Sequence, residues 1–453
     1  MPPLTGILMR NADYYHMEWL PDGYPGRRKG EELWAHPIYG SYALKDYLEQ
    51  FEKRPSEELR RGLRAVANAA VSRMEQHEGA LVFWYEEDGS NSRAVERHYS
   101  GLTQGYYAVY LARAAHVLAD EALKEVSERV FASLAVPVEK GGVLSCGLAG
   151  PSIAEVSQRP NSHILNGWQS ALAAILEYAE VTGQPQASQL AHDSAQEMAR
   201  LLPLYDAPAV ANSRYGLTGF VYARLVFRGP DPSSTGLRNT QLVIAGESSL
   251  AVDRVGGRRW QNHVLAQDVQ GGDPGALRPV GNVVRLNLVL SRISYPVPNR
   301  LITEVTGAGG LVEVQLQRGR YDPLTVSQAD RTWVTVARVD CAAGTSRIDV
   351  PLPWDTAELV AYPTNFAKKI DDKNTNVYHV VHINRLRELA STTGIRELGE
   401  WADTWLRYLG EWRGMAVYNG LFVRGGKGII PVAEAGRALP PSSAQVTDPD
   451  PIR

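Results

Sequence analysis

The chain has 453 residues, with 47 Lys and Arg against 50 Asp and Glu and a net charge of −3. At roughly 150 residues per domain, this length predicts two or three domains. Hydrophobic residues make up 44% and charged residues 21%, which is typical of folded proteins and excludes wholesale disorder. The lack of a basic excess disfavours nucleic acid as a partner. Two cysteines, Cys146 and Cys341, exclude a disulfide framework and a thiolate zinc site.

The two ends of the chain carry few signals. Residues 1–33 form an N-terminal extension, and their start shows no basic segment followed by a long apolar stretch, which predicts that there is no signal peptide. No window approaches about 20 apolar residues, so we expect no membrane-spanning helix and a cytoplasmic protein. Residues 431–453, rich in Pro, Ser and Asp toward their end, predict a flexible tail.

Helical periodicity dominates two stretches, 34–220 and 363–430. Long runs rich in Ala, Leu, Glu and Arg alternate with short turns that contain Gly or Pro. The runs predict three helical hairpins, namely 102–118 with 121–134, 166–182 with 187–202, and 381–392 with 397–412. Repeated helical hairpins arranged around an axis indicate an α/α toroid, here in two parts.

Between the two helical stretches, over residues 221–362, the period changes from 3.6 to 2. Alternating runs are separated by clusters of Gly, Pro and Asp, which is typical of an antiparallel β-sandwich. The runs are 221–227, 241–245, 283–293, 311–317, 332–339 and 347–352. We therefore expect an α + β multidomain protein in which a β-sandwich is inserted into the toroid, so that residues distant in sequence build the site.

Three predicted helix starts carry unusual polar groups. They comprise His98 and Tyr99 to Gln104, Glu155 to Trp168, and Tyr378 to Asn384. Since the inner helices of a toroid begin at one rim, these segments are expected to converge on one cleft. The chain also has 21 Tyr and 10 Trp but only 7 Phe, a bias compatible with a sugar-lined cleft and equally with half-buried packing.

Glu155 stands in a loop of low charge, where burial of its carboxylate would suit a general base. The alternative is a loop cap or a surface charge. His379 and His382 stand at i and i+3, but without an HExxH motif or a third ligand in reach a metal is disfavoured. We expect these histidines to form hydrogen bonds or to lower the pKa of a neighbouring tyrosine. Tyr378 and Tyr215 could each be a packed aromatic residue instead of a site residue.

Several common motifs are missing. The sequence contains no P-loop, no GxGxxG after a strand and no GxSxG elbow. These gaps disfavour nucleotide chemistry and an α/β-hydrolase.

Six segments occur in the order seen in D-glucuronyl C5-epimerases, which convert glucuronate to iduronate units in heparan-type polysaccharides. They are HPIYGSYALKDY (36–47), GLTQG (101–105), EVSQRPNSHILNGW (155–168), LPLYD (202–206), YGLTGF (215–220) and YHVVHINRL (378–386). The chain resembles this family over most of its helical part and not over the sandwich. The resemblance implies a toroid catalytic domain with β modules, a homodimer, and a uronic-acid polymer or glycoconjugate as substrate.

The resemblance also implies the site residues. A Glu and a Tyr acting on opposite faces of the sugar fall on Glu155 and Tyr378, and a third site tyrosine falls on Tyr215. The residues expected to bind substrate are Tyr99, Gln104, Arg159, Asn166, Trp168, His379, His382, Asn384 and Arg385. Ionisation of Tyr378 would need a cation nearby, such as Arg159, Arg385 or a histidine, because its ordinary pKa is about 10.

The sequence departs from the family at three points. Val156 replaces the tyrosine usual in animal members, and Thr218 replaces an arginine that is a carboxylate contact in the family. In animal members the sandwich precedes the helical domain, whereas here 221–360 separates Tyr215 from Tyr378.

We expect an epimerase that needs no cofactor and holds no metal at its site; a structural calcium ion is left open because no motif for it is readable. A polysaccharide lyase shares the same enolate chemistry. A glycoside hydrolase would need two carboxyl groups, for which Glu155 and Asp206 are the candidates. A non-catalytic carbohydrate-binding protein is the third class, favoured by Val156 and Thr218.

Overall fold

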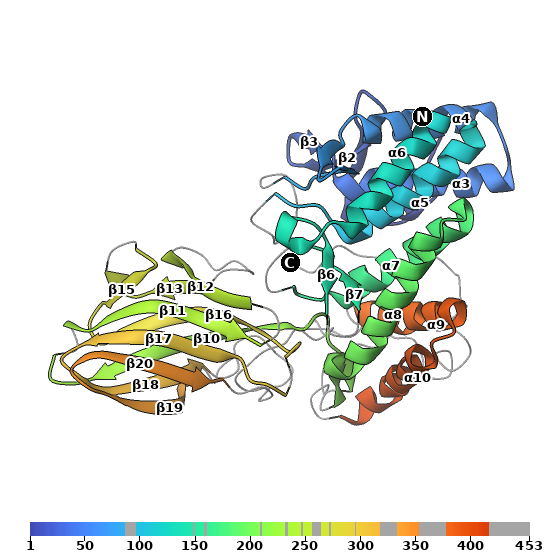
Figure 1. Cartoon of the computed structure of the whole chain (residues 1–453). Helices are drawn as coiled ribbons and strands as arrows, with labels where there is room; N and C mark the ends of the chain where they lie inside the picture. Colours follow the sequence, from blue (N-terminus) through green and yellow to red (C-terminus); the bar gives the residue numbers. More distant parts are fainter. Residues whose placement is uncertain are drawn as a thin grey trace. The chain divides into compact units, whose positions relative to one another are not determined.

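The structure is a computed structural model (Figure 1). It describes residues 1–86, 97–147, 150–157, 161–208, 211–231, 234–245, 248–255, 264–270, 273–294, 296–317, 333–352 and 377–415. Arg159 and the predicted tail 431–453 lie outside this range. The chain forms two compact units: in the described residues, the first holds 1–200 and 380–403, and the second holds 201–379 and 404–415. None of the helices in the described ranges combines the length and apolar character needed to cross a bilayer.

Helices build most of the first unit. The principal ones are α3 (Pro37–Lys53), α4 (Glu57–Val71), α5 (Gly101–Leu118), α6 (Glu121–Ala132) and α7 (Leu165–Thr182); α8 (Pro185–Tyr205), α9 (Val377–Thr393) and α10 (Arg396–Glu411) contribute residues to both units. The helices of the three predicted hairpins are thus all present.

Capping explains where these helices begin and end. Asp120 Oδ1 accepts a hydrogen bond from the Leu123 N–H at the start of α6, at 3.1 Å, and Ser100 caps α5 in the same way. Gly183 and Gly394 end α7 and α9 with φ values of +69° and +74°. Glycine adopts this left-handed conformation at no steric cost, which allows the chain to reverse into the next helix.

Residues 1–33 pack on α3 within the first unit. They contain α1 (Ile7–Arg10), α2 (Ala12–Tyr15) and a three-stranded antiparallel sheet of β1 (Met17–Trp19), β2 (Pro25–Lys29) and β3 (Glu32–Trp34). The Asp46 carboxylate of α3 accepts hydrogen bonds from the Thr5 and Gly6 N–H groups at 2.7 and 2.8 Å. The extension is therefore anchored on α3.

Three short strand pairs also interrupt the helical part and its junction with the β-rich region. They are β4 (Glu75–His77) with β5 (Ala80–Val82), β6 (Leu144–Cys146) with β7 (Pro151–Ile153), and β8 (Asp206–Ala207) with β9 (Asn212–Ser213), besides the N-terminal sheet. Periodicity did not predict these pairs because each strand has only two to five residues.

Strands of the second unit occupy the predicted β region. They are β10 (Thr218–Arg228), β11 (Gly236–Ile244), β12 (Ser248–Val255), β13 (Val264–Gln267), β14 (Val269–Gln270), β15 (Ala276–Pro279), β16 (Val283–Ser291), β17 (Arg300–Gly307), β18 (Gly310–Gln317), β19 (Trp333–Cys341) and β20 (Gly344–Pro351). Pairing among the described strands is antiparallel except between β12 and β13, which are parallel.

The β region has one apolar core. Strands β13, β16, β10, β18 and β19 form one run of neighbours, and β15, β11, β17 and β20 form another, visible in Figure 1. Alternate residues of both runs share that core, such as Leu225, Leu288, Leu301 and Ile348. The helix-bearing and strand-bearing regions therefore each bury their own apolar side chains. The predicted domain limits stay a prediction.

Candidate functional site

Glu155 is held by the backbone next to it. It follows β7, and only 9% of its surface is exposed. The Ala154 carbonyl accepts a hydrogen bond from the Gly101 N–H at 3.2 Å, and the Ala154 N–H donates to the Val143 carbonyl at 2.7 Å. A β-carbon at Gly101 would overlap the Ala154 carbonyl oxygen, so this close approach to the start of α5 requires glycine.

The Glu155 carboxylate lies against the first turn of α7. A β-carbon at Gly167, the third residue of that helix, would overlap Glu155 Oε2. The first turn of a helix carries N–H groups that have no partner within the helix and the positive end of its dipole, which stabilise a negative charge. Gly167 thus leaves room for this carboxylate, and Gly101 leaves room for the backbone that precedes it.

Further side chains of α7 serve the packing of the first unit. Gln169 Nε2 donates to the His382 carbonyl of α9 at 3.2 Å, and Trp168 Nε1 donates to Ser194 Oγ of α8 at 2.8 Å. Asn166 and His382 are buried, whereas Asn384 is half-buried. The first unit therefore gathers Glu155, Asn166, Trp168 and His382 around α7.

Tyr99 and Gln104 make their polar contacts inside the protein. The Tyr99 hydroxyl donates to the Ser133 carbonyl at 2.8 Å, and its burial raises its pKa. Gln104 accepts from the Phe83 N–H at 3.1 Å and donates to the Leu81 carbonyl at 2.8 Å. Both side chains are fully buried. These contacts favour a structural role, and substrate binding by either residue stays a prediction.

Tyr215 and Tyr378 lie together in the second unit. Their ring centroids are 4.9 Å apart with an angle of 73° between the rings, an edge-to-face contact. Tyr378, at the start of α9, is 1% exposed, and Tyr215 is half-buried. The chain segments that carry these two predicted site tyrosines therefore meet. Glu155 falls in the other unit, and its pairing with Tyr378 stays a prediction.

His379, next to Tyr378, forms hydrogen bonds that hold these chain segments together. The Ser213 N–H and Oγ lie 3.1 and 2.8 Å from His379 Nδ1, and His379 Nε2 lies 3.0 Å from the Trp405 carbonyl. Since the carbonyl can only accept, Nε2 carries the proton and Nδ1 accepts from Ser213. Burial lowers the pKa of His379 to about 4, so the ring is neutral at pH 7. His379 thus forms the hydrogen bonds that were one of its two expected roles, and a histidine cation beside Tyr378 stays a prediction.

Asp206 of the LPLYD segment holds α10. Its Oδ1 accepts hydrogen bonds from Trp405 Nε1 at 3.2 Å and from the Tyr408 hydroxyl at 3.0 Å. Burial raises the pKa of Asp206, and these two hydrogen bonds partly oppose the rise. Trp412 Nε1 adds a bond to the Ala211 carbonyl at 2.7 Å. The contacts favour a structural role for Asp206 over that of a hydrolytic carboxylate.

Sequence reasoning missed the partners Ser213, Trp405, Tyr408 and Trp412. The spacing of the three aromatic residues along 397–412 was a signal for them, whereas Ser213 had none. Arg385, a predicted cation, forms an ion pair with Glu388 at 2.6 Å on α9. Within the described ranges, no group of three or more His, Cys, Asp or Glu side chains is arranged to hold a metal ion.

Residues 80–226 match the family model described as D-glucuronyl C5-epimerase C-terminus. The resemblance predicted from the motifs is confirmed over this segment, which contains Glu155 and Tyr215 but not Tyr378. The match supports carbohydrate epimerase chemistry. No curated protein matches the chain.

Several solved structures show a weak likeness. An α-1,6-mannanase, GH76A from Salegentibacter sp. HEL1_6, is 14% identical over 45% of this chain and 52% of its own, with a TM-score of 0.32. A sugar epimerase from a ruminal bacterium is 11% identical over 47% and 56%, with a TM-score of 0.32. The endo-β-1,4-glucanase CMCax from Acetobacter xylinum is 11% identical over 47% and 61%, with a TM-score of 0.33. The chain thus spans little more than half the length of these proteins, and likeness at this level does not establish a shared fold.

Proposed function

We propose that this protein is a C5-epimerase that inverts D-glucuronate to L-iduronate residues in a uronic-acid polysaccharide or glycoconjugate. The observation that carries the proposal is the family match over 80–226 together with the buried Glu155 carboxylate within it. The finer architecture, an α/α toroid with an inserted β-sandwich, belongs to the same proposal. So does a homodimer, which light scattering at several protein concentrations tests.

The chemistry requires two different groups. The C5 hydrogen lies α to a carboxylate, and its removal creates an enolate that the site must stabilise. Inversion then needs a proton delivered to the opposite face of C5. We assign Glu155 as the base that takes the C5 proton, because it is a buried carboxylate within the segment that matches the family model. Tyr378 is assigned as the acid that returns a proton to C5.

The role of proton donor does not require a cation beside Tyr378. A phenol has an ordinary pKa near 10, so it is neutral at pH 7 and carries a proton to donate. The Tyr378 side chain is 1% exposed and packs edge-on against Tyr215. In the cycle the C5–H proton moves to Glu155, the Tyr378 O–H proton moves to C5, and solvent exchange restores both groups.

Deuterium exchange tests this function directly. The enzyme is incubated with a heparosan-like polymer in D₂O, and the uronate signals are followed by NMR. Deuterium at C5, iduronate signals and intact chains are the expected result. Unsaturated chain ends would indicate a lyase, new saturated reducing ends a hydrolase, and no exchange on any uronan a binding protein.

Two substitutions test the assigned roles. Glu155→Gln and Tyr378→Phe should each lower C5 exchange by at least about a thousandfold while the polymer still binds. The matched controls are Glu125→Gln on the exposed side of α6 and Tyr222→Phe on β10, which should retain exchange. Undiminished exchange in Glu155→Gln or Tyr378→Phe would remove that residue from the mechanism.

A further inference from the structure

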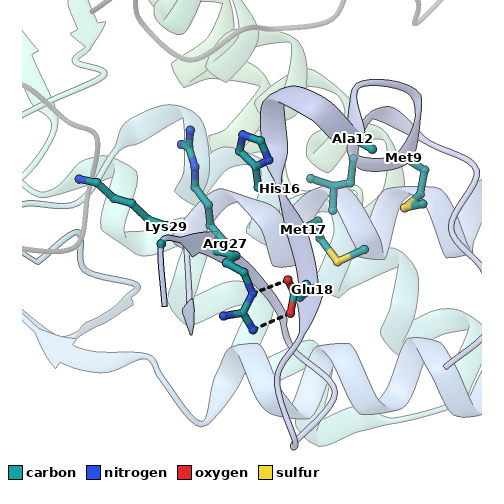
Figure 2. Close-up of a pocket in the computed structure, with 10 residues that line it drawn as sticks. Met9, Ala12, His16, Met17, Glu18, Arg27 and Lys29 are labelled. Atoms are coloured by element: carbon teal, nitrogen blue, oxygen red, sulfur yellow. Dashed lines mark hydrogen bonds and ion pairs between the residues drawn. The ribbon is translucent and has the colours of Figure 1, made fainter. Parts of the chain in front are cut away.

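A cavity of about 500 Å³ lies in the N-terminal part of the first unit. Its lining residues fall between Leu8 and Gly30, distant in sequence from the candidate site residues. Figure 2 shows its lining, which comes from the α1–α2 segment and from strands β1 and β2. Its walls differ in chemistry. Leu8, Met9 and Met17 provide apolar surface, whereas β2 supplies three consecutive cations.

The cationic side chains of the lining are Arg27, Arg28 and Lys29, and its single carboxylate is Glu18, on the neighbouring strand β1. Glu18 is engaged by Arg28 through two hydrogen bonds, one of which, from Nη2 to Oε2, measures 2.6 Å. The lining as a whole carries three cationic side chains and one carboxylate, although the chain has a net charge of −3. Such a local field attracts anions.

Backbone pairing fixes this wall. The Arg28 N–H donates to the His16 carbonyl at 3.0 Å, which brings His16 beside β2. The Arg27 guanidinium is buried, with its central carbon 5.9 Å from the centroid of the Tyr14 ring, whereas Lys29 is exposed. In Figure 2, Lys29 lies on the side of the cavity opposite Met9 and Ala12. The cavity thus offers a fixed charge, a movable charge and an apolar face.

We propose that this cavity binds an acidic sugar unit of the glycan, at a subsite separate from the reacting residue. The identity of the glycan, a uronic-acid polymer, rests on the proposed function. A uronate or sulfated sugar has an anionic group on a ring whose C–H face is apolar, which matches the two walls. Lys29 and Arg27 would attract the anionic group, and the ring would pack on Met9 and Met17.

Three variants test the subsite. The probe is a heparosan hexasaccharide, with a neutral hexasaccharide and inorganic sulfate as comparisons, and the readout is the dissociation constant by calorimetry. Lys29→Glu should weaken hexasaccharide binding about tenfold, because a charge-assisted contact is replaced by repulsion. Glu18→Gln should tighten it, because Arg28 is released. Arg27→Gln should also weaken binding. Because Arg27 is buried, Arg27→Gln could fail to fold, and in that case the exposed variant Lys29→Glu still provides the test.

The control is Lys124→Glu on the exposed face of α6, which should leave binding unchanged. Unchanged binding in both Lys29→Glu and Glu18→Gln would overturn the subsite. Equal effects on the neutral hexasaccharide, or sulfate binding as tight as the hexasaccharide, would also overturn it. If the cavity variants alter binding but the wild type shows no C5 exchange, the proposed function fails and the subsite stands. If the wild type shows C5 exchange but the variants bind as the wild type does, the proposed function stands and the subsite fails.

Discussion

At the scale of single residues, the space around Glu155 depends on what two positions lack. Gly101 and Gly167 begin different helices, and each leaves out the β-carbon that would collide with residues 153–155. A buried carboxylate normally costs free energy unless polar groups compensate for lost water. The glycine that makes room also places the carboxylate against the first turn of α7, where the helix dipole favours negative charge.

Gly167→Ala should therefore lower activity more than it lowers stability. The new methyl group overlaps Glu155 Oε2, so the carboxylate must move, and misplacing a reacting group by about 1 Å can cost about a hundredfold in rate. The measurement is C5 exchange alongside thermal unfolding.

Gly399→Ala in α10 is the matched control, because its β-carbon would meet only Ala390 Cβ at an ordinary 3.7 Å. Alanine favours helix by up to about 1 kcal/mol over glycine, so this variant should be equally or more stable with unchanged exchange. A fully active Gly167→Ala enzyme would show that Glu155 does not need its present position.

The sequence predicted part of this site. The low charge around Glu155 left burial and a surface position both open, and the structure buries the side chain. The second prediction, that the polar residues at a helix start face a cleft, did not account for Gln104, whose side chain forms hydrogen bonds with the backbone of Phe83 and Leu81. A sequence pattern places a residue on a helix turn but does not reveal which neighbouring backbone will satisfy it.

At the scale of elements, α9 links segments through a neutral histidine. His379 accepts from Ser213 of β9 and donates to Trp405 of α10, so one ring ties three elements together. Protonation of Nδ1 would turn an acceptor into a donor facing the Ser213 N–H. The link is therefore intact only while the ring is neutral.

This link predicts a pH dependence of stability. The histidine titrates near 6.5 in the unfolded chain and at about 4 in the folded one, so between these values only the unfolded state gains a proton. The free energy of unfolding should be unaffected by this group above pH 6.5 and should fall by up to about 3 kcal/mol as the pH drops to 4.

Comparison of the wild type with His379→Gln by denaturant unfolding at several pH values measures the effect. The variant should be less stable at neutral pH and should lose this share of the acid-side decline, whereas His116→Gln, at an exposed position of α5, should keep it. An unchanged decline in His379→Gln would assign the pH dependence to other groups.

Helix and strand positions followed from periodicity, because burial on one face imposes a spacing of 3.6 or 2 residues wherever an element is long enough. Pairing did not follow. The parallel contact of β12 with β13 and the contacts of α10 with Asp206 and Ala211 depend on chain segments far apart in sequence, which no local pattern encodes.

At the scale of the whole molecule, apolar residues gather in separate cores. Leu288 and Leu301 are buried among strands, and Leu172 and Ile175 are buried in α7. Each core has its own cooperative contacts, a condition under which all-or-none unfolding of a large chain is not expected.

Unfolding should therefore occur in two transitions by calorimetry. Leu288→Ala should lower the midpoint temperature of one transition and Leu172→Ala that of the other, because truncating a buried leucine lowers the free energy of unfolding by about 2–5 kcal/mol. Coincident shifts of a single transition by both variants would contradict the independence of the cores.

The bond between Ser213 and His379 joins residues 166 positions apart. During synthesis, at about 5–20 residues per second, His379 emerges roughly 10–30 s after Ser213, when the intervening strands have already left the ribosome. The contact between Tyr215 and Tyr378 therefore cannot form during that interval. A chain truncated anywhere in the β region contains Glu155 but lacks Tyr378. Under the proposed roles of Glu155 and Tyr378, chains truncated within the β region should therefore show no C5 exchange.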